Sequence, residues 1–280
     1  MPVEFEVPQP PEDGKRLAGL VALVTGAGAN VELPGTGVAM ASLFAAHGAK
    51  VGVVDVSDER AQRTVDLIES GGGEALKVIA DLTDDEECQR AVSEVVGRFG
   101  RLDIVVNNAA ITGGGLADEG NAVWDRVVAL NLTAVMQVSR AAVPHLVVAG
   151  GGSIINISSI AAFRGLGSGA YGAAKAGVQA LTIDYAYLYG RDNVRANCLA
   201  PGHLFTPMGD QGGPELREQR RRCCLMECEG NAWDVAYAAL WLASPESRWV
   251  TGLVIPIDGG TTSSTALGLQ MVEARQAARS

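Results

Sequence analysis

The chain has 280 residues, of which 48% are hydrophobic and 19% charged, which suits one well-buried globular domain and excludes a disordered or fibrous chain. With 22 Lys and Arg against 32 Asp and Glu, the formal net charge is −10. This excludes general binding to a nucleic-acid backbone, because that role needs a cationic surface. No apolar run approaches the roughly 20 residues of a membrane helix, and five cysteines, an odd number, argue against a disulfide framework. We therefore expect a cytoplasmic protein without nucleic-acid, membrane or metal partners.

Short β-branched runs alternate with longer Ala-rich amphipathic segments over residues 15–260, between an acidic, Pro-rich leader (1–14) and a polar tail (261–280). The expected strands are Val21–Thr25, Lys50–Asp55, Ala75–Ile79, Ile104–Asn107, Ser153–Ile157, Val194–Leu199 and Val254–Ile257. The expected helices are Gly37–His47, Glu59–Ser70, Asp84–Phe99, Asn121–Ala149, Ala170–Tyr189 and Trp233–Ala243. The alternation predicts a single-domain, Rossmann-like α/β fold, a doubly wound parallel seven-stranded sheet with helices on both faces. The tail is either a frayed end or an arm that packs on a neighbouring subunit.

A glycine-rich turn follows the first expected strand. It contains Thr25 and Gly26, and after a detour Gly35 and Gly37 open the first expected helix. Glycines allow a close approach of the backbone, and a helix N-terminus offers N–H groups to a pyrophosphate. Such a turn also occurs without a nucleotide, so it is weak evidence by itself.

Two carboxylates follow at the ends of the next strands. Asp55 lies close to the ~20-residue offset from Gly37 at which an acidic side chain accepts hydrogen bonds from an adenosine ribose. A carboxylate there repels a 2′-phosphate and favours NAD over NADP; the alternative is that it organises the following turn. Arg60, the competing basic residue, is expected to face solvent. Asp81 either bonds the adenine amino group or caps the following helix.

Tyr171 and Lys175 lie four residues apart, so both side chains fall on one helix face. A nearby ammonium stabilises a phenolate and lowers the tyrosine pKa toward working pH, which makes Tyr171 a candidate general acid/base. A serine hydroxyl from Ser158 or Ser159, after the preceding strand, can hold the substrate oxygen. A Tyr and a Lys at this spacing are often merely solvated; their combination with the serines and the glycine turn predicts an oxidoreductase.

From about Leu17 to Gly260 the sequence resembles the short-chain dehydrogenase/reductase family, whose motifs it carries in order. They are the Thr25-Gly26 turn, Asp81, Asn107-Asn108-Ala109-Ala110, Asn131, Ser159, Tyr171 with Lys175, Pro201-Gly202 with Thr206, and Ile257-Asp258-Gly259-Gly260. The resemblance implies that Tyr171 is the acid/base and that Lys175 binds the nicotinamide ribose and lowers the Tyr171 pKa. It also implies that Ser159 orients the substrate oxygen and that Asn131 holds a water in the proton relay.

An NAD site is expected from these motifs together. The expected cofactor-binding residues are Thr25, Gly26, Gly35, Gly37, Asp55, Asp81, Leu82, Asn107, Ala109, Tyr171, Lys175, Pro201, Gly202 and Thr206.

Three departures from the family pattern stand out. Positions 27–34 form a loop five residues longer than usual, which is typical of a subgroup that also carries a Trp-Asp-Val-Ala segment like Trp233–Ala236. Ala110 stands where the family has Gly. Ser159 lies one residue nearer to Tyr171 than usual, which leaves Ser158 as the alternative.

The segment 203–230 takes the place of the family's substrate lid. Its arginines can meet an acidic substrate, or they form a solvated helix balanced by Glu215 and Glu218. The residues concerned are Arg217, Arg220, Arg221 and Arg222. The residues expected to line the substrate cavity are His203, Leu204, Phe205 and Met208.

The expected reaction is NAD-dependent hydride transfer between a secondary alcohol and its ketone. The alternatives are an NADP-dependent ketone reductase and a nucleotide-sensing or scaffold protein without turnover. The two long helices Asn121–Ala149 and Ala170–Tyr189 carry small residues that allow close packing, and the resemblance implies that they pair across a two-fold axis; the alternative is that this face packs only on its own sheet. We expect a homo-oligomer, a tetramer or a dimer.

Overall fold

A seven-stranded parallel sheet forms the centre of the computed structural model, which describes residues 14–30, 33–115, 120–209 and 213–277. Its strands are β1 (Val21–Thr25), β2 (Lys50–Asp55), β3 (Glu74–Ile79), β4 (Ile104–Asn107), β5 (Gly152–Ile157), β6 (Val194–Pro201) and β9 (Val254–Ile257). They lie in the order β3-β2-β1-β4-β5-β6-β9. The strand order reverses between β1 and β4, as expected for a doubly wound sheet.

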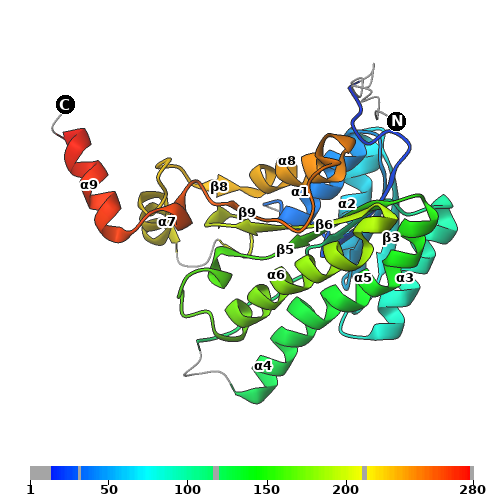
Figure 1. Ribbon diagram of the computed structural model, residues 1–280, viewed down its shortest axis with the longest axis horizontal. Coiled ribbons are helices and arrows are strands. Elements are labelled where there is room, and N and C mark those ends of the chain that lie inside the picture. Colours follow the sequence, from blue (N-terminus) through cyan, green and yellow to red (C-terminus); the bar gives the residue numbers. More distant parts are fainter. Residues whose placement is uncertain (1–13, 31–32, 116–119, 210–212, 278–280) are drawn as a thin grey trace, which may run out of the picture.

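Helices cover both faces of the sheet (Figure 1). They are α1 (Thr36–Ala46), α2 (Asp58–Ser70), α3 (Asp85–Phe99), α4 (Asn121–Val128), α5 (Ala134–Val148), α6 (Gly169–Tyr189), α7 (Gly213–Arg222), α8 (Ala232–Ala243) and α9 (Ala266–Ala277). Alternate residues of β1 point to opposite faces: Ala22 and Val24 pack in the core beneath α1, α2 and α8, whereas Val21 and Leu23 pack in the core beneath α3, α5 and α6. This two-sided burial explains the nearly continuous apolar strands.

The segment from α4 to α5 is one continuous helix of 28 residues, Asn121–Val148, with a mean hydropathy of 1.3 over its most apolar stretch. This corrects the expectation that no apolar run approaches membrane-spanning length. The apolar side chains have a different use here, because Val138, Ala142 and Leu146 are buried against the sheet and α3. Such burial is typical of the core helix of a globular protein.

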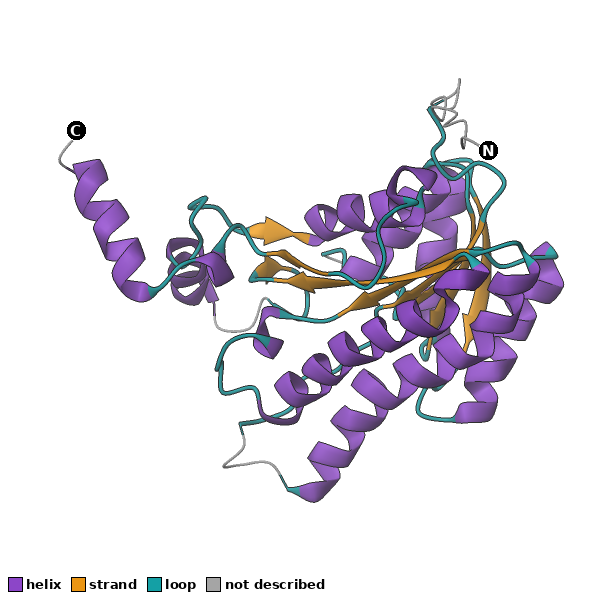
Figure 2. Ribbon diagram, in the orientation of Figure 1, coloured by secondary structure: helices purple, strands orange, loops and turns teal. Residues whose placement is uncertain are grey.

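Two features, a short second sheet and a helix in the tail, were not predicted from the sequence, whereas α7 is the solvated helix that was one of two interpretations of the lid arginines. Helix α7 and a two-stranded sheet, β7 (Leu204–Phe205) with β8 (Gly230–Asn231), lie within the segment expected to be the lid. Helix α9 occupies the tail, which the sequence left open between a frayed end and an arm. Figure 2 shows α9 standing apart from the layers around the sheet.

Candidate active site

The predicted motifs meet at the carboxyl edge of the sheet, where β1, β2, β4, β5 and β6 end. Thr25, Asp55 and Asn107 are the last residues of their strands, and Pro201 ends β6. The reversal of strand order between β1 and β4 opens a crevice at this edge in doubly wound sheets, and ligands bind there.

The glycine turn between β1 and α1 can be built only without side chains at two positions. Gly26 has a φ of +61°, and a Cβ on it would lie 2.7 Å from the Ala109 Cα. A Cβ on Gly37 would lie 2.3 Å from the Gly26 carbonyl oxygen. Gly35 precedes α1, and a Cβ there would meet no described atom within 4 Å. No described side chain caps α1 at this position, and the first N–H groups of a helix have no acceptor within the helix, so with the helix dipole they fit a pyrophosphate.

Asn108 holds this turn in place, a role that the sequence did not assign to it. Its Nδ2 donates to the carbonyl oxygens of Thr25 (3.0 Å) and Gly26 (3.1 Å), and its Oδ1 accepts from Thr36 Oγ1 (2.7 Å). The backbone N–H groups of Asn108 and Ala109 donate to Thr25 Oγ1. The only hint of this role in the sequence was that Asn108 directly follows Asn107 within the family motif.

Asn107, which was predicted to lie in the turn against the adenosine ribose, directs its side chain into the helical layer. Its Nδ2 donates to Ser139 Oγ (2.9 Å) and to Asn156 Oδ1 (2.8 Å). Asn156 in turn donates to Thr182 Oγ1 (2.9 Å). This buried network ties β4 and β5 to α5 and α6, so the side chain of Asn107 is structural and only its backbone lies at the edge.

Asp55 is 7% exposed, and its carboxylate is partly engaged. It accepts from the backbone N–H groups of Gly28 (2.9 Å) and Ser57 (3.0 Å), and from Arg60 Nη2 (2.8 Å). Asp55 therefore organises the following turn, as the alternative interpretation predicted. The expectation that Arg60 faces solvent is wrong, because its guanidinium turns inward to pair with the buried carboxylate. Asp55 Oδ2 accepts a single described bond and keeps a free acceptor position, so the site still fits a ribose hydroxyl.

The first half of the lengthened loop is fastened to α2. Thr64 Oγ1 donates to the Ala27 carbonyl oxygen (2.6 Å), and Arg63 Nε donates to that of Ala29 (3.1 Å). The Ala29 N–H donates to the Arg60 carbonyl oxygen (2.9 Å). The insertion therefore packs beside Asp55; its residues 31–32 lie outside the described part.

Asp81 does not cap α3, which corrects one of its two interpretations. The cap is Asp84, whose carboxylate accepts from Glu86 and Glu87 N–H groups. Asp81 is exposed and accepts from the Thr83 N–H and hydroxyl (3.0 and 2.7 Å), while Leu82 is buried. The Asp81 carboxylate therefore remains open to solvent just beyond the end of β3.

Beyond β6, the backbone at Gly202 is fixed by a hydrogen bond from its N–H to the Ile257 carbonyl oxygen (2.9 Å). Thr206 is buried and accepts from the Gly209 N–H (3.3 Å). The segment Pro201–Thr206 thus lies over the edge next to the residues that follow β9.

Lys175 is buried beneath the candidate acid/base. It is 1% exposed, its Nζ donates to the Ile157 carbonyl oxygen (2.7 Å), and it lies 5.7 Å from the centre of the Tyr171 ring. Burial lowers its pKa to about 8. An ammonium with one described acceptor has N–H groups left for a ligand.

Ser158 and Ser159 are separated by their hydrogen bonds. Ser158 is buried; its Oγ donates to the Lys175 carbonyl oxygen (2.8 Å) and accepts from Gln179 Nε2 (3.2 Å). Ser159 is partly exposed, accepts from the Ala161 N–H (3.2 Å) and hydrogen-bonds to Tyr171. The geometry therefore favours Ser159, the residue preferred from the sequence, as the hydroxyl that faces a substrate.

The expected lowering of the Tyr171 pKa is not found. Burial raises the pKa of this phenol above its ordinary value, and only the hydrogen bond with Ser159 acts against the rise. The reason is geometric, because Lys175 lies over the ring and directs Nζ to a backbone carbonyl. The phenol is thus held in its protonated form.

Asn131 occupies a π-helical turn, Ala129–Thr133, between α4 and α5. The turn is a typical feature of functional sites. Asn131 is fully buried; its Oδ1 accepts from the Ile111 N–H (2.9 Å) and its Nδ2 donates to the Ile111 carbonyl oxygen (2.8 Å). It therefore fixes the loop after β4 beside Tyr171's helix, against which this turn packs.

An open pocket of about 510 Å³ lies between the glycine loop, the loop after β4 and the segment after β6. Its lining residues are Asn30, Ala110, Ile111, Thr112, Arg126, Pro207 and Met208. Of the residues expected to line the substrate cavity, Met208 lies in this pocket. The prediction for Leu204 was wrong, because its side chain is buried in the core.

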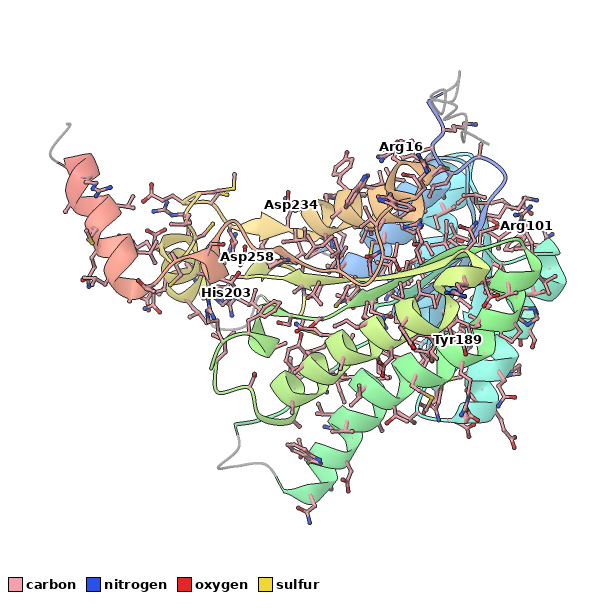
Figure 3. All side chains as sticks on the ribbon, viewed as in Figure 1. Arg16, Arg101, Tyr189, His203, Asp234 and Asp258 are labelled. Atoms are coloured by element: carbon pink, nitrogen blue, oxygen red, sulfur yellow. The ribbon has the colours of Figure 1, made fainter. Side chains whose placement is uncertain are left out.

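The lid also packs on the residues after β9, and Figure 3 shows His203 and Asp258 at the same end of the sheet. Burial and nearby Arg220 lower the His203 pKa.

The lid arginines are mostly neutralised. Arg217 pairs with Glu229 (2.6 Å) and stacks 3.5 Å from the Phe205 ring centre. Arg221 and Arg222 both pair with Glu218 at 2.8 Å. The solvated-helix interpretation is thus favoured, with Glu218 and Glu229 as the described partners.

Comparison with known proteins agrees with this architecture. A family model described as enoyl-(acyl carrier protein) reductase matches residues 32–262. The 2,5-dichloro-2,5-cyclohexadiene-1,4-diol dehydrogenase LinX of Sphingobium indicum is 40% identical over 247 residues, which covers 88% of this chain and 97% of that protein. The 7alpha-hydroxysteroid dehydrogenase of Escherichia coli strain K12 is 33% identical over 250 residues, covering 89% and 96%.

Solved structures of related proteins also superpose closely on this chain. Levodione reductase superposes with a TM-score of 0.85 at 32% identity, covering 89% of this chain and all of that one. A 7alpha-hydroxysteroid dehydrogenase complexed with NADH and 7-oxo glycochenodeoxycholic acid superposes with a TM-score of 0.84 at 32% identity, covering 89% and 97%. The chain belongs to the short-chain dehydrogenase/reductase family of oxidoreductases, whose members bind nicotinamide cofactors.

Proposed function

We propose that the protein is an NAD-dependent dehydrogenase that interconverts a secondary alcohol and its ketone, with Tyr171 as general acid/base. One observation carries the proposal: the Tyr171–Ser159 hydrogen bond lies beside buried Lys175, at the same sheet edge as the open start of α1. The related dehydrogenases named above support the alcohol/ketone class.

The residues present fit a dinucleotide. The N–H groups at the start of α1 would hold the diphosphate, and the free acceptor position of Asp55 would hold the adenosine ribose. Lys175 would donate to the nicotinamide ribose. When bound, the cofactor supplies the hydride acceptor or donor.

The proton is handled by the chain itself. In ketone reduction the Tyr171 hydroxyl gives its proton to the substrate oxygen, which Ser159 orients, and in alcohol oxidation the phenolate takes it back. Asn131 holds a water that passes the proton onward. Because burial raises the Tyr171 pKa, we expect kcat/KM for oxidation to rise with pH and kcat/KM for reduction to fall.

The ion pair between Asp55 and Arg60 favours a second candidate, an NADP-dependent ketone reductase. A guanidinium at 2.8 Å offsets the carboxylate that would repel a 2′-phosphate, and Arg is a strong phosphate ligand. NAD remains the first choice because the carboxylate is buried at the strand end while the arginine is 39% exposed.

The quaternary structure is proposed from one face of α6. Ala173, Ala176, Ala180, Ile183 and Tyr187 recur along it at helical spacing and are exposed in the single chain. Small and apolar residues in such a row allow two helices to pack closely, so we propose a homodimer or tetramer in the cytoplasm. A monomeric mass by light scattering would contradict it.

The test is a pair of titrations, of NAD(H) and NADP(H) into the purified protein, followed by a screen of secondary alcohols that records the absorbance of the reduced nicotinamide. Tighter NAD(H) binding with turnover is expected. Tighter NADP(H) binding would transfer the assignment to the reductase, and binding without turnover of any alcohol or ketone would favour a sensor. Absence of binding would overturn the proposal.

A further inference from the structure

Arg126, in α4, is the charged residue among those that line the open pocket. Four of the other six lining residues are apolar: Ala110, Ile111, Pro207 and Met208. Arg126 is exposed at this open pocket, so its guanidinium can meet an anion that enters from solvent, while the apolar residues offer a surface for the rest of the molecule. The pocket thus combines a cation with room for an apolar body, and its 510 Å³ suits a small organic molecule.

Other cations around this edge already have a described acceptor, and the remaining N–H groups of Lys175 are assigned to the cofactor by the proposed function. Lys175 donates to the Ile157 carbonyl oxygen, Arg164 to that of Thr262, and Arg220 to that of Gly209. Arg217 pairs with Glu229. For the Arg126 side chain, by contrast, the described residues provide neither an ion pair nor a hydrogen bond. Within the described part of the chain, its guanidinium therefore keeps its donors for a ligand.

The diphosphate of the cofactor does not need Arg126. The start of α1 already offers it N–H groups and the positive end of a helix dipole. A second anion is therefore the better match, and it must come with the substrate. The net charge of −10 strengthens this assignment, because an acidic protein repels anions unless a local cation holds them.

We propose that Arg126 binds a carboxylate of the substrate, so that the substrate is a hydroxy acid or keto acid with an apolar body. The fork of the guanidinium matches the two oxygens of a carboxylate. Ile111 places this group beside the reacting end, because it lines the pocket and also holds the Asn131 side chain. The assignment rests on the proposed function for its alcohol or ketone part.

The test is calorimetric titration of hexanoate and of hexanamide, which differ in charge and not in chain length, with and without saturating NAD+. Wild type is expected to bind hexanoate more tightly than hexanamide. Arg126→Gln should weaken hexanoate binding about 10- to 100-fold, the loss typical of one charged hydrogen-bonding partner, and leave hexanamide unchanged. Arg126→Lys should retain part of the preference. Arg191→Gln, at an exposed arginine outside the pocket, is the matched control and should behave as wild type.

Equal affinity of wild type for the acid and the amide would overturn the proposal, as would unchanged hexanoate binding by Arg126→Gln. Weaker NAD+ binding by Arg126→Gln with unchanged hexanoate binding would also overturn it, since Arg126 would then serve the diphosphate. A chain that binds hexanoate through Arg126 but fails to bind NAD+ would separate the two claims, because only the proposed function would fall.

Discussion

The cofactor end of the sheet edge (residues 25–30, 33–37, 55–60 and 107–111) and the described part of the lid (203–209 and 213–230) are held by different kinds of contact. At the cofactor end, Asn108 bonds backbone carbonyls and Gly37 packs on the Gly26 backbone. In the lid, the prominent contacts are ion pairs between partly exposed side chains, such as Arg222 with Glu218. Backbone contacts tolerate few alternatives, whereas exposed ion pairs contribute little stability. The cofactor end should therefore be rigid and sensitive to substitution, and the lid adaptable.

The largest expected effect falls on the reacting group. Tyr171→Phe removes the proton donor and keeps the ring over Lys175, so turnover should fall at least about 100-fold, the lower range for loss of a general acid/base. NAD+ affinity should change little. Steady-state kinetics and calorimetry check both. Retained turnover would show that another group carries the proton.

Lys175→Met should abolish turnover without lowering the stability of the fold, because the same buried ammonium that serves the reaction destabilises the folded state. Burial lowers the Lys175 pKa from 10.5 to about 8, so the folded state disfavours the charged form. The resulting loss in the free energy of unfolding is absent above pH 10.5 and grows as the pH falls toward 8. Below pH 8 this loss is constant at about 3 kcal/mol. The variant should lose turnover and yet be at least as stable as wild type below pH 8. Urea denaturation of both proteins at pH 7 and pH 10 measures the difference, and a variant that is less stable at pH 7 would contradict it.

Gly37→Ala tests the rigidity of the cofactor end. Its Cβ would lie 2.3 Å from the Gly26 carbonyl oxygen, so the backbone must shift, at a cost of about 1–3 kcal/mol together with weaker NAD+ binding. Gly97→Ala in α3 is the control, since its Cβ meets no described atom within 4 Å and should stabilise the helix by about 1 kcal/mol. Equal Tm values for the two variants would break the comparison.

Asp55→Asn removes the charge and keeps the shape. With Arg60 then unopposed, the ratio of NAD+ to NADP+ affinity should fall about tenfold, the equivalent of roughly 1.4 kcal/mol. Competition titrations with both cofactors measure it. An unchanged ratio would mean that cofactor choice is made elsewhere.

The smallest effect is expected in the lid. Arg222→Gln removes one ion pair of an arginine that is 67% exposed, and Glu218 keeps its pair with Arg221. The Tm and NAD+ affinity should stay within experimental error. A clear loss of stability would show that the lid is held as firmly as the cofactor end.

The same contrast explains what could be predicted from the sequence. Strands β1, β2, β4 and β9 begin and end where the apolar runs predicted. For β1, β2 and β4 the nearly continuous burial leaves little choice of boundary, whereas β9, at the edge of the sheet, is only partly buried. The motif residues likewise lie at the expected edge. Local pattern left α7 as one of two alternatives and could not reveal the β7–β8 pair, since their segment has few buried apolar residues and depends on contacts with distant residues such as Gly259.

Individual side chains of the site were harder to predict than their positions. The pairing of Arg60 with Asp55 depends on how the start of α2 lies over the end of β2, and the clamp formed by Asn108 depends on how the ends of β1 and β4 lie relative to one another. Neither follows from spacing. The predicted direction of the Tyr171 pKa shift was wrong for a related reason. The sequence gives the distance along the helix to Lys175 but not the depth of burial, which decides the direction.

The most direct test of the central claim, that this sheet edge is a nicotinamide site, is hydrogen–deuterium exchange with and without saturating NAD+. We predict slower exchange at the start of α1, in the turn after β4 and around Ser159 and Tyr171, with little change in α3. No change at the start of α1, or protection confined to α7 and α9, would contradict the account.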